Sequence, residues 1–182
     1  HWSAPFIADL EELTKIGDPA ALCLRHLLTK LKNERLTLLA IVRDLRKLFR
    51  EHRKDDLRSL LSVPGVGFIT ASTFLAEIGD ASRFATEDEF TSYIGLVPST
   101  NNTGETQKTG GLTPRKNSLL KHLIIEAAWI SIRKDPGLTA SFCTYCRRMK
   151  KTEAIVRIAA KLLNRMRHVW LHQTTYKIQL VG

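Results

Sequence analysis

The sequence is poor in cysteine, in long apolar runs and in strand patterns. Its 182 residues include only three cysteines: Cys23, Cys143 and Cys146. The last two form a C-x-x-C pair, but no second Cys or His pair follows at zinc-finger spacing. The sequence therefore predicts reduced structural cysteines and no metal site. Strand patterns are weak, and the only short candidates are residues 93–97 and 176–181.

Membrane and export signals are also missing. No run of 18 or more apolar residues occurs, and the first residues, HWSAPFIADLEEL, lack a basic region followed by an apolar one. We therefore expect a cytoplasmic protein without a membrane partner. The chain begins at His1 rather than at methionine, so we also expect it to be a fragment of a longer protein.

The net charge of +10 is unevenly distributed along the chain. Residues 1–60 hold 12 basic and 9 acidic residues, residues 61–110 hold 2 and 6, and residues 111–182 hold 14 and 3. The basic surface is thus C-terminal. Nucleic-acid phosphate is the usual partner of such a concentration. The absence of an apolar anchor argues against anionic lipid, and a merely solvated basic helix is the alternative.

The apolar pattern predicts a mainly α fold, with residues 1–60 as an N-terminal segment plus coiled-coil helix and residues 61–182 as a compact helical domain. One long helix is expected from about Pro19 to Ser62. Its apolar residues alternate in steps of four and three, which is typical of a coiled-coil seam and favours a homodimer or higher oligomer. The seam consists of Leu24, Leu28, Leu31, Leu38, Val42, Leu45 and Phe49, with Arg35 as its one polar member.

Residues 60–79, LLSVPGVGFITASTFLAEIG, predict a helix-hairpin-helix. Gly65, Val66 and Gly67 form the turn, where glycines allow close approach to a phosphate and the amides that open the second helix bind it. A plain helical hairpin with a tight glycine turn is the alternative.

Four further helices are expected. A capping box at Thr86–Glu89 starts one that runs to about Ile94. The others span about 113–133, 138–149 and 152–172, with a break at Asp135-Pro136-Gly137. The last is amphipathic: its apolar side comprises Ile155, Ile158, Ala159, Leu162, Leu163, Met166 and Val169, and Arg157, Lys161 and Arg165 repeat every four residues on another side as candidate nucleic-acid contacts.

A hydroxyl-rich loop is expected at residues 95–117, GLVPSTNNTGETQKTGGLTPRKN. Six Ser or Thr residues, four glycines and only three aliphatic residues cannot form a core of their own, and loops this long are uncommon without a function. Hydroxyls beside glycines suit a phosphate site with a nucleophile, and Arg115 and Lys116 supply charge. Glu105 and His122 are weaker acid–base candidates, because a solvated carboxylate and a structural histidine explain them as well. A disordered surface loop is the alternative.

The order of these motifs resembles the C-terminal portion of bacterial insertion-sequence transposases of the one-hundred-and-ten family, also called DEDD transposases, which include the pilin-gene invertases. The resemblance rests on SVPGVGFITASTFLAEIG, GLVPSTNNTGETQKTGGLTPRKNSLLKHLIIEAAW, EAIVRIAAK and LLNRMR. It implies a separate RuvC-like domain with four acidic residues that bind a divalent metal (Mg²⁺), a dimerising coiled coil, a serine nucleophile, DNA as substrate and a bridge RNA as guide. No cofactor is expected in the present chain.

In similar members of this family the motif G-L-x-P is followed several residues later by Ser-Gly. Aligning Gly95–Pro98 with that motif without a gap places Thr103-Gly104 at the position of Ser-Gly. Three possibilities follow: Thr103 is an altered nucleophile, Ser99 replaces it, or the copy is inactive. The resemblance thus implies the DNA-binding and strand-exchange portion of a transposase, which we expect to be inactive on its own. The alternatives are a non-catalytic helix-hairpin-helix module with a dimerising helix and a coiled-coil interaction protein that binds no nucleic acid.

Overall fold

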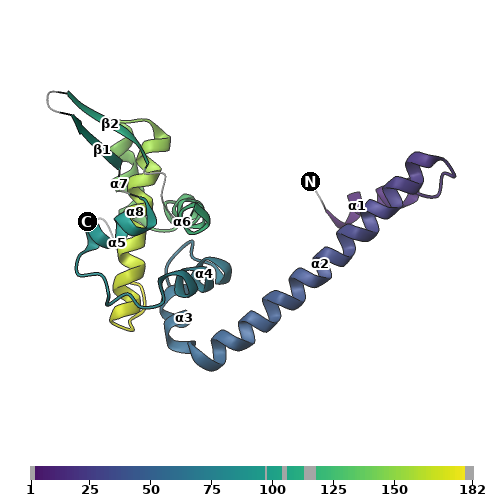
Figure 1. Ribbon diagram of the computed structural model, residues 1–182, viewed down its shortest axis with the longest axis horizontal. Coiled ribbons are helices and arrows are strands. Elements are labelled where there is room, and N and C mark those ends of the chain that lie inside the picture. Colours follow the sequence, from purple (N-terminus) through teal and green to yellow (C-terminus); the bar gives the residue numbers. More distant parts are fainter. Residues whose placement is uncertain (1–2, 97, 104–105, 113–117, 179–182) are drawn as a thin grey trace. The chain divides into compact units, whose positions relative to one another are not determined.

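The computed structural model describes residues 3–96, 98–103, 106–112 and 118–178 (Figure 1). The chain forms two compact units, His1–His52 and Arg53–Gly182. The first unit contains two helices, and the described part of the second contains six helices and one two-stranded hairpin, so the predicted mainly α fold is confirmed. Their bounds are α1 Ala4–Leu13, α2 Pro19–His52, α3 Lys54–Leu61, α4 Phe68–Ile78, α5 Glu87–Ile94, β1 Pro98–Thr103, β2 Thr106–Leu112, α6 Ser118–Ser131, α7 Pro136–Cys146 and α8 Lys151–Leu171.

The first unit is a helical pair in which α1 packs along the beginning of α2. Arg25 donates a 2.8 Å hydrogen bond to the Thr14 carbonyl, and Lys32 pairs with Glu11 at 2.6 Å. Helix α1 was not expected from the sequence. Its local signal was present, since Ser3 caps the helix by accepting a hydrogen bond from the Phe6 amide.

Helix α2 has 34 residues and therefore spans about 51 Å. Of the predicted seam, Leu28 is buried, whereas Leu38 is 60% exposed. Leucines outside the seam, such as Leu36 and Leu39, are 66% and 65% exposed. Apolar side chains thus remain accessible along α2, and the coiled coil stays a prediction.

The single helix predicted from Pro19 to Ser62 is wrong, because the structure breaks it at Arg53. This residue has φ −142° and ψ 40°, outside the helical region, and caps α3. Leu57 and Leu60 of α3 are buried in the second unit, where α3 packs on α4 and α8. The break lets the apolar face of α3 turn toward that core, and the boundary between the units lies at residues 52/53 instead of 60/61.

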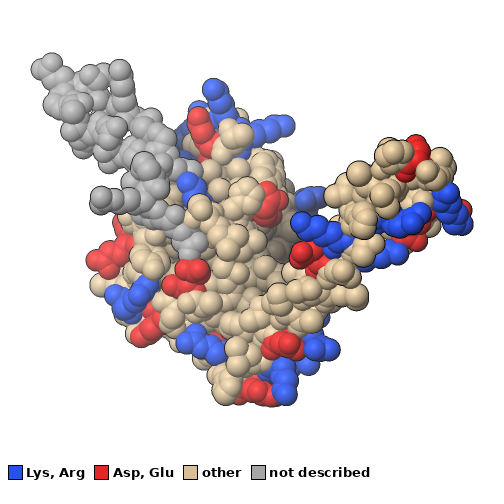
Figure 2. All heavy atoms as spheres, turned by 45° about the vertical axis from the view of Figure 1, so that its right-hand side comes forward, with Lys and Arg blue, Asp and Glu red and all other residues tan. Residues whose placement is uncertain are grey.

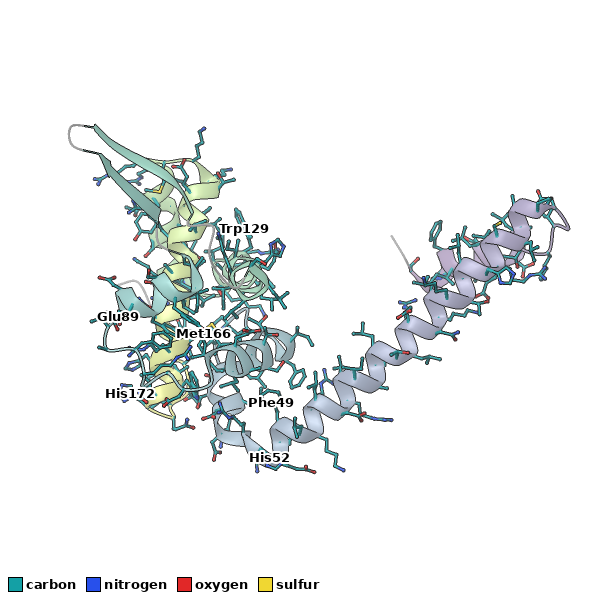
Figure 3. All side chains as sticks on the ribbon, in the orientation of Figure 1. Phe49, His52, Glu89, Trp129, Met166 and His172 are labelled. Atoms are coloured by element: carbon teal, nitrogen blue, oxygen red, sulfur yellow. The ribbon has the colours of Figure 1, made fainter. Side chains whose placement is uncertain are left out.

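The second unit is organised around α8, which packs against α3, α5, α6 and α7 (Figure 1). All seven apolar residues predicted on α8 are buried, and Met166, labelled in Figure 3, is fully inaccessible. Phe74 and Phe90 pack edge to face with ring centroids 6.0 Å apart. The predicted Thr86 cap of α5 is confirmed, because Thr86 accepts from the Glu89 amide at 3.1 Å. The Glu89 carboxylate accepts from the Ala85 amide, one residue before the N-cap.

The expected loop at 95–117 contains a β-hairpin, which corrects the loop prediction. Strands β1 and β2 pair antiparallel, with Thr103 opposite Thr106 and a register shift between Pro98 and Ser99. The strand candidates at 93–97 and 176–181 are not borne out in their described residues, since 93–94 end α5 and 176–178 form no strand. Threonine has a high strand propensity, so this segment pairs locally although it has little apolar surface.

Candidate functional site

The predicted phosphate-binding turn is a tight turn between α3 and α4. The Val66 amide donates a 3.1 Å hydrogen bond to the Val63 carbonyl, with Pro64 and Gly65 at the two central positions. Gly65 has φ +85°, which is the conformation that glycine adopts at the second central position of a type II turn. The sequence Pro-Gly thus explains the turn directly.

One side of this turn is packed against α6. A Cβ atom on Gly65 would lie 2.4 Å from the Ala127 carbonyl oxygen. The Ser131 hydroxyl lies within hydrogen-bonding distance of two carbonyl oxygens, that of Pro64 and that of Ala127. The distance to the Ala127 oxygen is 2.7 Å. Gly65 therefore has a packing role against α6, in addition to the phosphate contact predicted for it.

The other side of the turn is more open. Gly67 is exposed, has φ −92° and would have no heavy atom within 4 Å of an added Cβ. It is the N-cap of α4, and no side chain caps this helix. Val66 is buried. Of the three predicted turn residues, Gly67 is thus the one with space for a ligand.

The hairpin carries both candidate nucleophiles. Ser99 pairs with Gly110 and Thr103 pairs with Thr106 across the hairpin. Four residues along a strand correspond to about 13 Å between the two Cα atoms. The two positions are therefore distinct, and one phosphate cannot be attacked equally from both. Arg115 and Lys116, together with the side chains of residues 97–117, lie outside the described part.

A buried ionic cluster joins α7, α8 and the C-terminal segment, which comprises the described residues 172–178 after α8. Asp135 is fully buried and caps α7 by accepting a 3.1 Å hydrogen bond from the Leu138 amide. Its other carboxylate oxygen accepts from Arg165 at 2.9 Å and from the Tyr176 hydroxyl. Burial, and then the hydrogen bond to Asp135, raise the pKa of Tyr176 to about 12.

The three predicted basic residues of α8 therefore differ in their surroundings. Arg165 is paired with Asp135 inside the fold, with its side chain 23% exposed. Arg157 and Lys161 are exposed and lie 5.8 Å and 5.2 Å from the centre of the Tyr145 ring. Lys161 also donates to the Ser141 hydroxyl at 3.2 Å. Only Arg157 and Lys161 are accessible as the sequence suggested.

An open groove of about 700 Å³ lies between α8 and the C-terminal segment that follows it. On the face drawn in Figure 2, Lys and Arg alternate with Asp and Glu, so positive charge has to be located residue by residue. The groove is one place where individual positive side chains can be located. Its charged and hydroxyl-bearing lining comes from Glu87, Lys161, Arg165, His168, Thr174, Thr175, Tyr176 and Lys177.

Sequence reasoning missed Asp135 and Tyr176. It interpreted Asp135-Pro136-Gly137 as a helix break, which is correct, but the same residues begin α7. Aspartate followed by proline is a recognised helix start, because the carboxylate caps and proline fits the first turn. Nothing local marks Tyr176, whose partners lie 11 and 41 residues away.

Other candidate sites gain no support. All three cysteines are free. Among the described residues no group of three or more His, Cys, Asp or Glu side chains is arranged to hold a metal ion. His122 is exposed on α6, and Glu105 lies outside the described residues. No helix in the described ranges has the length and apolarity needed to cross a bilayer.

Residues 57–143 match the family model described as the transposase IS116/IS110/IS902 family. This range begins in α3 and ends in α7, so it includes both the glycine turn and the hairpin. The basic residues of α8 and most of the groove lining lie outside the matched range.

Named relatives agree with this match. A "Probable family 20 transposase" of Pseudomonas aeruginosa is 37% identical over 110 residues, which are 59% of this chain and 32% of the relative. The "Transposase for insertion sequence element IS1111A" of Coxiella burnetii is 27% identical over 111 residues, 61% of this chain and 30% of the relative. An "Insertion element IS110 uncharacterized 43.6 kDa protein" of Streptomyces coelicolor is 34% identical over 107 residues, 58% and 26% respectively.

The chain spans about a third or less of the length of these curated relatives. Over part of its length the chain is thus similar to transposases of the IS116/IS110/IS902 family.

Proposed function

We propose that this chain is the DNA-engaging and strand-exchange portion of an insertion-sequence transposase. The observation that carries the proposal is the match over residues 57–143 to a transposase family. A hairpin with hydroxyl residues lies within this range, between α5 and α6. DNA is the substrate, and the activity belongs to a longer protein to which this portion contributes.

The reaction is a phosphoryl transfer. A hydroxyl oxygen of the hairpin forms a bond to a DNA phosphorus, the bond from phosphorus to one bridging oxygen breaks, and the leaving oxygen takes a proton. A hydroxyl of the second DNA strand then attacks the same phosphorus and releases the protein. Such a reaction needs in-line geometry and cations on the non-bridging oxygens, and Arg115 and Lys116, at the end of the same segment, are the proposed charge stabilisers.

Thr103 is the proposed nucleophile, and Ser99 is the second candidate. The threonine methyl group restricts χ1 and crowds the approach to phosphorus. Thr103→Ser should therefore retain or raise transposition by the longer protein that contains this chain, whereas Thr103→Ala should abolish it. Equal transposition by all three forms would exclude position 103. Loss with Ser99→Ala alone would move the role to Ser99.

Three further parts of the proposal follow the resemblance. A RuvC-like domain of the longer protein supplies four acidic residues and bound Mg²⁺, a bridge RNA selects the DNA sequence, and α2 dimerises. Phosphate contacts position a protein without reading sequence, which is compatible with a guide RNA. Sedimentation of the chain with Leu38→Glu tests dimerisation. An oligomer of unchanged mass would remove the α2 seam from the interface.

A non-catalytic DNA-binding module is the second candidate function. The tight Pro64-Gly65 turn and the open Gly67 at the start of α4 favour it, because a helix-hairpin-helix can bind phosphate without any nucleophile. This alternative predicts that the double change Ser99→Ala and Thr103→Ala leaves transposition intact. Loss of transposition with intact DNA binding would reject it.

A further inference from the structure

The groove along α8 differs from the predicted DNA contacts in having two walls. One wall is the exposed side of α8, with Lys161 and His168. The other is the C-terminal segment, with Thr174, Thr175 and Lys177. Hydroxyls and cations facing one open groove are the groups that bind a phosphodiester backbone, through hydrogen bonds and charge respectively.

The second wall is held in a defined position. The Thr174 amide donates to the Val169 carbonyl at 3.0 Å, and the Gln173 side chain donates to Asp56 at 2.7 Å. The Tyr176 amide donates to the Ser62 hydroxyl at 2.8 Å, while its own hydroxyl donates to Asp135. The segment is thus attached to α3, α7 and α8, and the groove exists before any ligand binds.

The charges of the groove cancel only in part. Arg165 is balanced by Asp135, whereas Glu87, whose carboxylate accepts a 2.7 Å hydrogen bond from the neutral Asn164 amide, keeps its negative charge. Lys161 and Lys177 together outnumber this single carboxylate in the lining. Lys161 contacts only neutral partners, and Lys177 is exposed; neither makes an ion pair with a described residue. Two lysines, one on each wall, therefore remain available to an anion.

We propose that this groove binds the phosphodiester backbone of DNA, with Lys161 and Lys177 as phosphate contacts and with Arg165 and Tyr176 as positioning residues that hold the second wall. The proposal rests on the proposed function, because that function makes DNA the partner. It also assigns roles to the C-terminal segment and to His168, which lines the same groove and can donate to the same backbone.

The test measures binding of the 182-residue chain to a short DNA duplex by fluorescence anisotropy over a series of salt concentrations. Binding weakens as salt rises, and each lost phosphate contact reduces the steepness of log K against log salt by about 0.9. The double change Lys161→Ala with Lys177→Ala should therefore reduce the steepness by about 1.8. The matched control is Lys30→Ala with Lys54→Ala, which removes the same charge from two exposed lysines on α2 and α3. Its slope should stay that of the wild type.

The outcomes separate the two proposals. If the wild-type chain binds DNA and the groove variant and the control variant show the same slope, the groove is not the phosphate-binding site. The proposed function would still stand in that case. Absence of salt-dependent binding by the wild type overturns both. A single-stranded RNA of equal length is the second arm, and a slope change with RNA but none with DNA overturns the choice of DNA. Thermal melting of both variants by circular dichroism shows that they are folded.

Tyr176→Phe tests the positioning role. It retains both lysines but removes the hydroxyl that attaches the second wall to Asp135. It should lower the slope by about 0.9, because Lys177 is no longer held in place, and should have no further effect in a Lys177→Ala background. An equal change in both backgrounds, or no change in either, overturns the positioning role.

Discussion

Replacing Gly65 by alanine should destabilise the second unit strongly. The added Cβ atom would lie 2.4 Å from the Ala127 carbonyl oxygen, 2.7 Å from the Ser131 hydroxyl and 3.0 Å from the Ser131 amide nitrogen. Two of these three atoms belong to the backbone of α6 and cannot rotate away. Alanine would also have to adopt φ +85°. The left-handed conformation costs about 1–2 kcal/mol and overpacking about 1–3 kcal/mol, so we expect a loss of about 2–5 kcal/mol in the free energy of unfolding.

Gly67→Ala is the matched control, only two residues away. Its φ of −92° suits any residue, and an added Cβ would meet no atom within 4 Å. Glycine is a better N-cap than alanine, so we expect a loss of about 0.5–1 kcal/mol. Urea unfolding followed by tryptophan fluorescence reports on this unit, because Trp129 and Trp170 lie in it. Equal losses in the two variants would refute the assignment of Gly65 to close packing and of Gly67 to an open surface.

Three further substitutions follow from the caps and the buried cluster. Asp135→Asn keeps a cap for α7 but leaves the partly buried Arg165 without its counter-ion, and it should cost about 3 kcal/mol by urea unfolding; a loss below 1 kcal/mol would contradict this account. The raised pKa of Tyr176 means that its stabilising contribution is present below pH 10 and is lost as the pH rises toward 12. Tyr176→Phe should therefore flatten the fall in stability between pH 10 and 12, and an unchanged fall would show that other groups cause it. Thr86→Ala should cost about 1 kcal/mol through the lost cap of α5, and an unchanged melting temperature would exclude that cap as stabilising.

Helices with local signals could be predicted from the sequence. The start of α5 was found from its capping box, and its end follows from Gly95, which has φ +84°. Helix α8 was found within one residue at each end, because its apolar period is regular and its buried face matches that period. Both kinds of signal act within a few residues of the chain, so tertiary structure was not needed to read them.

The break at Arg53 and the hairpin could not be predicted in the same way. The helical period predicted from the sequence continues past residue 53, and only the packing of Leu57 and Leu60 in the second unit accounts for a helix that begins anew at Lys54. The hairpin has hardly any apolar alternation, which is the usual strand signal. Its pairing depends instead on threonine-rich strands joined by the two residues between Thr103 and Thr106.

The candidate site shows the same limit most clearly at Arg165. Helical spacing places Arg157, Lys161 and Arg165 on one side of α8, and the sequence gives no reason to treat them differently. Asp135 lies 30 residues before Arg165, and only the fold brings them to 2.9 Å. Neutralising all three residues together would therefore weaken folding as well as binding, and a loss of DNA affinity could not be assigned to either. Changing Lys161 and Lys177 leaves the buried cluster intact, which is why this pair, and not the periodic triplet, isolates the contribution of phosphate contacts.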